Sequence, residues 1–139
     1  MNWQGRSISP GTIRGESLVT QAGISFFGGV DPETGCVVEK GHPLEGQSIT
    51  GKVLVFSTGK GSTVGSYTLY RLKKAGLAPI AILNAECETI TAVGCIIAEI
   101  PCVDHLPIEQ IPNGAQIEVD ANTGQVQLLT KNSATFPAS

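Results

Sequence analysis

The sequence predicts a single mixed α/β domain that spans residues 1–139. Short segments that are apolar, or that alternate polar and apolar residues, recur between turns rich in Gly and Pro, as β-strands do. In the middle of the chain the patterns run strand, helix, strand, helix, strand, which is typical of a sheet covered by helices. Near the end, residues 115–129 alternate on both sides of DANTG, which predicts a β-hairpin. We expect residues 131–139 to be a flexible tail.

Four short strands are expected before the middle of the chain: residues 5–11, 15–20, 24–30 and 36–39. The first two alternate polar and apolar side chains, as strands with one buried face do. The last two flank the sequence DPETG, in which Pro is second and Gly is last, as in tight turns. We therefore expect residues 36–39 to be a returning strand.

Two buried strands are predicted next. Residues 51–56 are apolar on both faces, which indicates a central strand, and residues 78–84 repeat that pattern. A helix is expected between them. It should begin near Ser62 or Thr63, whose hydroxyl groups suit an N-cap, and it should end at Gly76, which suits a left-handed stop.

A second helix is predicted within residues 87–100, which carry apolar side chains at Ile90, Val93, Ile96 and Ile97. Together with the first helix, it is expected to pack on the outside of the sheet.

The charge of the chain argues against a nucleic-acid-binding protein. Nine Lys and Arg residues against twelve Asp and Glu residues give a net charge of −3, and the basic residues are scattered instead of forming a basic stripe. No apolar run approaches the roughly 18 to 20 residues of a membrane span. The N-terminal segment also lacks the apolar core of a signal peptide. We therefore expect a cytoplasmic protein that binds neither nucleic acid nor membranes.

The spacing of cysteines and histidines predicts no metal site. None of the cysteines forms a C-x-x-C pair, the spacing usual in zinc and iron–sulfur sites, so buried structural thiols are expected. The two histidines, His42 and His105, have no neighbouring nucleophile and carboxylate and are expected on the surface. The four cysteines are Cys36, Cys87, Cys95 and Cys102.

The glycine-rich sequence STGKGST, residues 57–63, follows the predicted central strand. It is not a nucleotide-triphosphate loop, because Gly61 and not Ser or Thr follows Lys60. It is not the dinucleotide fingerprint either, because its G-x-G-x-x-x-G spacing is one residue too long. Glycines at a helix start still let backbone amides approach an anion. A tight turn with a serine cap explains the same spacing, so the spacing leaves both interpretations open.

Five segments, in this order, resemble the small subunit of the aconitase X family: GGVDPETG, HPLEGQSITGKVLVF, GKGSTVGSYTLYRL, GLAPIAILN and AVGCIIAEIPCVD. The resemblance runs from about Gly28 to Asp104. It implies a fold similar to the swivelling domain of aconitase, a mixed β/β/α barrel. This fold is compatible with the order of elements predicted above.

The resemblance also implies a hydro-lyase that consists of two different subunits. In this family a large subunit carries an iron–sulfur cluster, expected to be [4Fe-4S], so the chain should bind no cofactor or metal itself and should be active only as a heterodimer. The sequence KGSTVGSY favours dehydration of a small phosphorylated hydroxy acid, mevalonate 5-phosphate, with cis-3-hydroxy-L-proline as the alternative substrate. A non-catalytic domain that holds an anion, or that serves assembly, is the alternative from another class.

The resemblance assigns Ser62 as the base that takes a proton from carbon. A serine hydroxyl is a poor base at neutral pH, so its alkoxide needs electrostatic stabilisation, which amides at a helix start can supply. The family also places its GGVD segment beside this loop, so we expect the turn and the loop to face the large subunit together. The expected substrate-binding residues are Lys60, Gly61, Thr63, Gly29 and Asp31.

Overall fold

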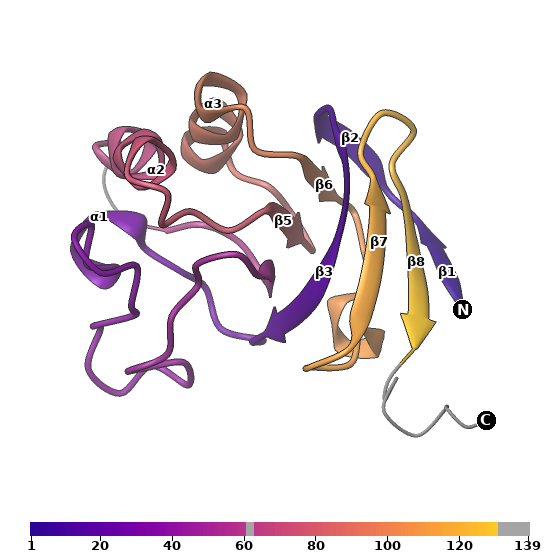
Figure 1. Ribbon diagram of the computed structural model, residues 1–139, viewed down its shortest axis with the longest axis horizontal. Coiled ribbons are helices and arrows are strands. Elements are labelled where there is room, and N and C mark those ends of the chain that lie inside the picture. The colour runs from indigo at the N-terminus through magenta and orange to yellow at the C-terminus, as the bar shows by residue number, and fades with distance from the viewer. Residues whose placement is uncertain (61–62, 131–139) are drawn as a thin grey trace.

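The computed structural model describes residues 1–60 and 63–130, and these form a mixed sheet with helices packed against it (Figure 1). This architecture confirms the predicted mixed α/β class. The predicted flexible tail lies outside the described residues. The strands are β1 (Asn2–Gln4), β2 (Arg6–Ser9), β3 (Thr12–Val19), β4 (Val53–Phe56), β5 (Ala81–Asn84), β6 (Cys102–Asp104), β7 (Gln116–Asp120) and β8 (Gln125–Thr130). The helices are α1 (Phe26–Gly29), α2 (Gly65–Lys74), α3 (Thr89–Ala98) and the 3₁₀ turn η1 (Ile108–Gln110).

The strand order in the sheet is β1-β8-β7-β3-β4-β5-β6-β2. Strands β3, β4, β5 and β6 run parallel, and every residue of β4 is buried because both faces of this strand are covered. The predicted central strand is therefore confirmed. Strands β7 and β8 pair antiparallel, which confirms the predicted hairpin.

The N-terminal segment closes the sheet into a barrel-like form. The two edge strands, β1 and β2, are joined by Gly5 alone, and they pair with β8 and β6. Gly5 suits this junction, since a Cβ atom at this position would overlap the carbonyl oxygen of Asp104. Arg6 then ties β2 to β6 through two hydrogen bonds to the Asp104 carboxylate, 2.9 and 2.8 Å long.

The alternation of side chains along β4 separates two apolar cores. Val53 and Val55 belong to the core enclosed between the parallel strands and the β7–β8 hairpin. Leu54 and Phe56 point the other way and pack in the same core as Leu69 of α2. Helices α2 and α3 lie side by side over this second face (Figure 1). Within the described part of the chain, no helix is long and apolar enough to cross a bilayer.

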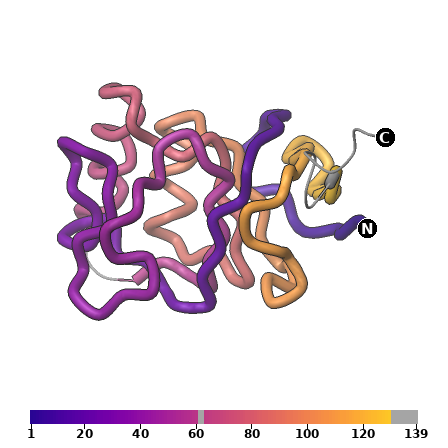
Figure 2. Tube along the Cα trace, turned by 60° about the horizontal axis from the view of Figure 1, so that its bottom comes forward, coloured from indigo at the N-terminus to yellow at the C-terminus, as the bar shows by residue number. Residues whose placement is uncertain are grey.

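The segment between β3 and β4 differs from the prediction of strands. Residues 24–30 contain the short helical turn α1, which is interrupted at Gly28, where φ is +88°. This backbone conformation suits glycine and ends an extended strand. Residues 36–39 make isolated bridges instead of a strand. The segment forms a loop-rich lobe at the end of the molecule away from the β7–β8 hairpin (Figure 2).

The expectation that His42 lies on the surface is wrong. Its side chain is buried between the lobe and the segment that leads to α1. The His42 Nδ1 atom accepts a hydrogen bond from the Leu44 amide at 3.0 Å. The Nε2 atom therefore carries the proton and donates to the Gly23 carbonyl oxygen at 2.9 Å. The buried ring holds two loops together. His105 is half-exposed, as expected.

Candidate functional site

The glycine-rich loop leaves the carboxyl end of β4, at the edge where the parallel strand β5 also ends. The Ser57 carbonyl oxygen accepts hydrogen bonds from the amides of Ala85 and Glu86, each 3.1 Å long. On the other side, the Ile24 amide donates to the Thr58 carbonyl oxygen at 3.2 Å, and the Lys60 amide donates to the Ile24 carbonyl oxygen at 3.0 Å. Residues 57–60 therefore run between the end of β5 and the segment before α1. Ligands of open parallel sheets bind at this edge.

Gly59 lies directly against the start of α3. A Cβ atom at Gly59 would overlap Thr91 Oγ1 and Glu88 Oε1. Glu88 is the N-cap of α3, and its carboxylate accepts hydrogen bonds from the Ile90 amide at 2.8 Å and the Thr91 amide at 2.7 Å. The Thr91 hydroxyl donates to the same carboxylate at 2.6 Å. The loop therefore packs against the hydrogen-bonded N-cap of α3. Local sequence patterns did not indicate this contact.

Lys60 and Gly29, two of the predicted binding residues, line one shallow pocket. This pocket has a volume of about 250 Å³ and is also lined by Ser25, Gly28 and Glu39. The Lys60 ammonium group pairs with the Glu39 carboxylate at 3.0 Å. Both side chains are partly exposed, so an anionic ligand can compete for this cation at modest cost. The structure thus places the turn and the loop beside one pocket; that both face the larger subunit stays a prediction of the family resemblance.

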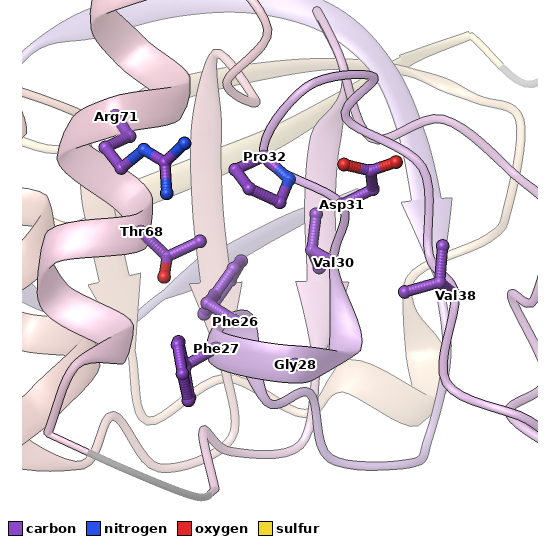
Figure 3. Close-up of a pocket in the computed structure, with 9 residues that line it drawn as sticks. All are labelled: Phe26, Phe27, Gly28, Val30, Asp31, Pro32, Val38, Thr68 and Arg71. Carbon is purple, nitrogen blue, oxygen red and sulfur yellow. The ribbon is translucent and has the colours of Figure 1, made fainter.

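Asp31 lines a neighbouring pocket of about 370 Å³ (Figure 3), and Gly28 lines both pockets. Its Oδ1 atom accepts a hydrogen bond from the Glu33 amide at 2.9 Å, so one carboxylate oxygen stabilises the DPETG turn. Across the pocket, α2 presents Thr68 and Arg71 one turn apart. The i, i+3 spacing of these two residues was the only local sign that they share a face.

Ser62 and Gly61 lie outside the described residues. Thr63 is exposed at the start of α2, and its carbonyl oxygen accepts a hydrogen bond from the Ser66 amide at 3.3 Å. The expected N-cap at Thr63 is wrong, because the helix begins at Gly65 and the capping residue is Val64. A Cβ atom at Gly65 would lie 3.8 Å from atoms of Phe26 and Phe27, so the N-terminal end of α2, with the positive end of the helix dipole, lies beside α1.

Within the described part of the chain, the one group of side chains spaced to hold a metal ion contains no cysteine. Cys87, Cys95 and Cys102 are buried, as predicted, whereas Cys36 is half-buried. The Sγ atoms of Cys87 and Cys102 lie 3.9 Å apart inside the apolar core. The hydrogen bond with Cys102 and burial both raise the pKa of Cys87, so this side chain stays a protonated thiol inside the core.

One cluster of side chains contains residue types that are common in metal sites. Glu86, Asp104 and His105 place possible ligand atoms within 4.8 Å of one another. Arg6, however, already pairs with both oxygens of Asp104, and the Cys87 amide donates to one of them at 2.8 Å. The cluster is an ion-paired structural contact between β2 and β6.

The glycine-rich loop lies at the carboxyl edge of a closed, mixed sheet, and this architecture matches that of an aconitase-type swivel domain. The chain belongs to the aconitase X family, because the family model for the aconitase X swivel domain matches residues 2–128. A crystal structure of Thermococcus kodakaraensis aconitase X (holo-form) superimposes with a TM-score of 0.91 at 49% identity, covering 93% of this chain and 98% of that one. A solution structure of a UPF0107 protein gives a TM-score of 0.84 at 46% identity, covering 93% and 99%.

The curated relatives have a more particular name. The phosphomevalonate dehydratase small subunit of Methanosarcina acetivorans is 54% identical over 91% of this chain and 90% of that protein. The protein of the same name from Thermococcus kodakarensis is 50% identical over 93% of this chain and 97% of that protein. The chain therefore spans nearly the whole length of these relatives.

Proposed function

We propose that the chain is the small subunit of a phosphomevalonate dehydratase, a hydro-lyase that acts only together with a larger subunit. The observation that carries this proposal is the similarity, at about half identity over nearly full length, to curated proteins of that name. These names favour mevalonate 5-phosphate over cis-3-hydroxy-L-proline as substrate. The reaction would remove water and give trans-anhydromevalonate 5-phosphate in the mevalonate route to isoprenoids, in the cytoplasm.

In this proposal Ser62 accepts the proton next to the substrate carboxylate. Two observations support that role. Thr63, the next residue, is exposed at the N-terminal end of α2, where the positive end of the helix dipole favours negative charge. The preceding residues, Gly59 and Lys60, are held on the same edge of the sheet. Amides there would stabilise the serine alkoxide.

The substrate would contact the loop and the turn that lies beside it. Lys60 would attract its negative charge once released from Glu39, and Gly29 leaves room for it in the shared pocket. Gly61 and Thr63 would donate backbone amides, and Asp31 would border the substrate on the side of the DPETG turn. These roles rest on position in the fold and on the family resemblance.

An iron–sulfur cluster, expected to be [4Fe-4S], would belong to the larger subunit and would supply the Lewis acid that helps the hydroxyl group leave. The buried thiols of this chain do not fit such a group. The part played by this chain would be to accept the proton, bind the substrate and cover the site.

The Ser62→Ala variant tests the proposal in the reconstituted two-subunit enzyme. Loss of a general base lowers turnover by about 10²- to 10⁴-fold, and assembly and the melting temperature should stay close to those of the unaltered protein. The matched control is Thr63→Ala, which should lower turnover far less. The measurements are steady-state dehydration of mevalonate 5-phosphate and thermal unfolding. Near-normal turnover by Ser62→Ala would contradict the role of the serine.

A further inference from the structure

We propose that the outer surface of α3, formed by Val93, Ile96 and Ile97, is a docking face for the larger subunit. This inference rests on the proposed function, because it requires that the chain is one subunit of a two-subunit enzyme. It goes further by placing the contact on a helix outside the candidate site.

The composition of α3 is unusual for a surface helix. The sequence TITAVGCIIA contains no charged residue. A helix that is apolar all round is normally buried on all sides. In this structure, however, Val93, Ile96 and Ile97 remain 44%, 55% and 51% exposed.

The buried side of α3 carries its small residues and the exposed side carries its large ones. Toward α2 and the sheet, α3 buries Thr91, Gly94, Cys95 and Ala98. A Cβ atom at Gly94 would come within 2.7 Å of Leu69 Cδ1, so the two helices already touch closely. The large aliphatic side chains are thus not needed to pack this domain. Burial of each would favour a further contact by removing apolar surface from water.

Hydrogen bonds hold α2 and α3 in a fixed position relative to each other. The Ser66 hydroxyl donates to the Ile90 carbonyl oxygen at 2.6 Å. The Lys73 ammonium group donates to the carbonyl oxygens of Ala98 and Glu99 at 3.0 and 3.1 Å. A partner can therefore bind to a surface whose shape is already set, which lowers the entropic cost of association.

The position of α3 points to the larger subunit as its occupant. The cap of α3, Glu88, contacts Gly59 of the candidate loop, so a chain that completes the site would lie near the N-terminal end of this helix. The relatives named small subunit are matched over nearly their full length, so the rest of that enzyme is on another chain. The absence of charge along α3 favours an apolar protein surface over an anionic lipid surface or nucleic acid, which would select basic residues.

The test uses the Ile96→Asp/Ile97→Asp double variant and the large phosphomevalonate dehydratase subunit of the same organism. Both side chains are half-exposed, so the isolated small subunit should keep its circular dichroism and melting temperature. Its affinity for the large subunit, measured by titration calorimetry, should fall by about 100-fold or more, because two charges would be buried without partners. The control is Leu129→Asp, which changes an aliphatic residue on β8 that is 38% exposed, and should bind normally.

Normal affinity of the double variant would overturn the proposal. So would self-association of the unaltered small subunit that the double variant abolishes, since a second copy would then be the occupant. If the aspartates unfold the chain, Ile96→Ser/Ile97→Ser replaces them, and unchanged affinity of that variant would be equally decisive.

The outcomes also separate this inference from the proposed function. Assembly without dehydration of mevalonate 5-phosphate would contradict the function and leave the docking face in place. Dehydration with normal affinity of the double variant would contradict only the docking face. If the unaltered chain fails to assemble, both proposals fall.

Discussion

Gly59 shows how a single residue can set the position of the candidate loop. Its hydrogen atom faces Glu88 Oε1 and Thr91 Oγ1, where a methyl group would overlap both atoms. The loop therefore approaches α3 more closely than any other residue would allow. From the spacing of the loop glycines, anion binding and a tight turn both stayed open, and the packing of Gly59 against the helix cap is a separate reason for glycine at this position.

We expect Gly59→Ala to lower both stability and turnover. The added methyl group must displace either the loop or the cap, and such overpacking costs about 1–3 kcal/mol. Because the loop leads to Ser62, turnover of the reconstituted enzyme should fall by about 10-fold or more if that serine is the base. The control is Gly65→Ala, whose Cβ would make an ordinary 3.5 Å contact with Ile90 Cγ2. Urea unfolding and dehydration kinetics measure the two effects, and an unaffected Gly59→Ala would contradict the packing argument.

At the scale of the element, α2 and α3 have different N-terminal caps. α3 begins at Glu88, whose carboxylate accepts two backbone amides and the Thr91 hydroxyl. α2 begins after Val64, a residue with no polar side chain, although Thr63 was the expected cap.

Removal of the α3 cap should destabilise the domain. Glu88→Ala leaves two amides without their acceptor and should lower the free energy of unfolding by about 1–2 kcal/mol. Glu88→Gln keeps one acceptor oxygen and should cost less. In the Gly59→Ala/Glu88→Ala double variant the loss of unfolding free energy should be smaller than the sum of the losses in the two single variants. The reason is that Glu88→Ala removes one of the two atoms that the new methyl group at position 59 would overlap. Strict additivity in urea unfolding would show that the loop and the cap are independent.

At the scale of the whole molecule, an ion pair with one buried partner adds to the strand pairing that closes the barrel. Asp104 is fully buried and Arg6 is about half-exposed, and together they join the first segment of the chain to β6. Burial acts to raise the pKa of Asp104, but the Arg6 hydrogen bonds and the Cys87 amide outweigh it, so the pKa of this carboxyl lies below its usual range.

This lowered pKa predicts how stability depends on pH. The folded state holds Asp104 ionised more strongly than the unfolded state does, so the contribution is fully present above the usual carboxyl pKa of about 4. It should be lost as the pH falls through the lower folded value. In Asp104→Asn the free energy of unfolding, measured from about pH 2 to pH 6, should depend less on pH than in the unaltered protein. Glu86→Gln, at an exposed neighbour, serves as the control. An unchanged acid slope in Asp104→Asn would contradict the assignment.

The amino-acid sequence by itself determined the central strands, the C-terminal hairpin and the existence of α2 and α3, because their periodicity and turns are properties of adjacent residues. It also located the glycine-rich loop, and the roles proposed for Ser62 and its neighbours stay predictions. Only the tertiary structure decided the helical turn at Phe26–Gly29, the burial of His42 and the close packing of Gly59 against Glu88. It also decided the closure by Arg6 and Asp104, which are 98 residues apart. Such contacts join distant parts of the chain, and their energy exists only once folding has brought those parts together.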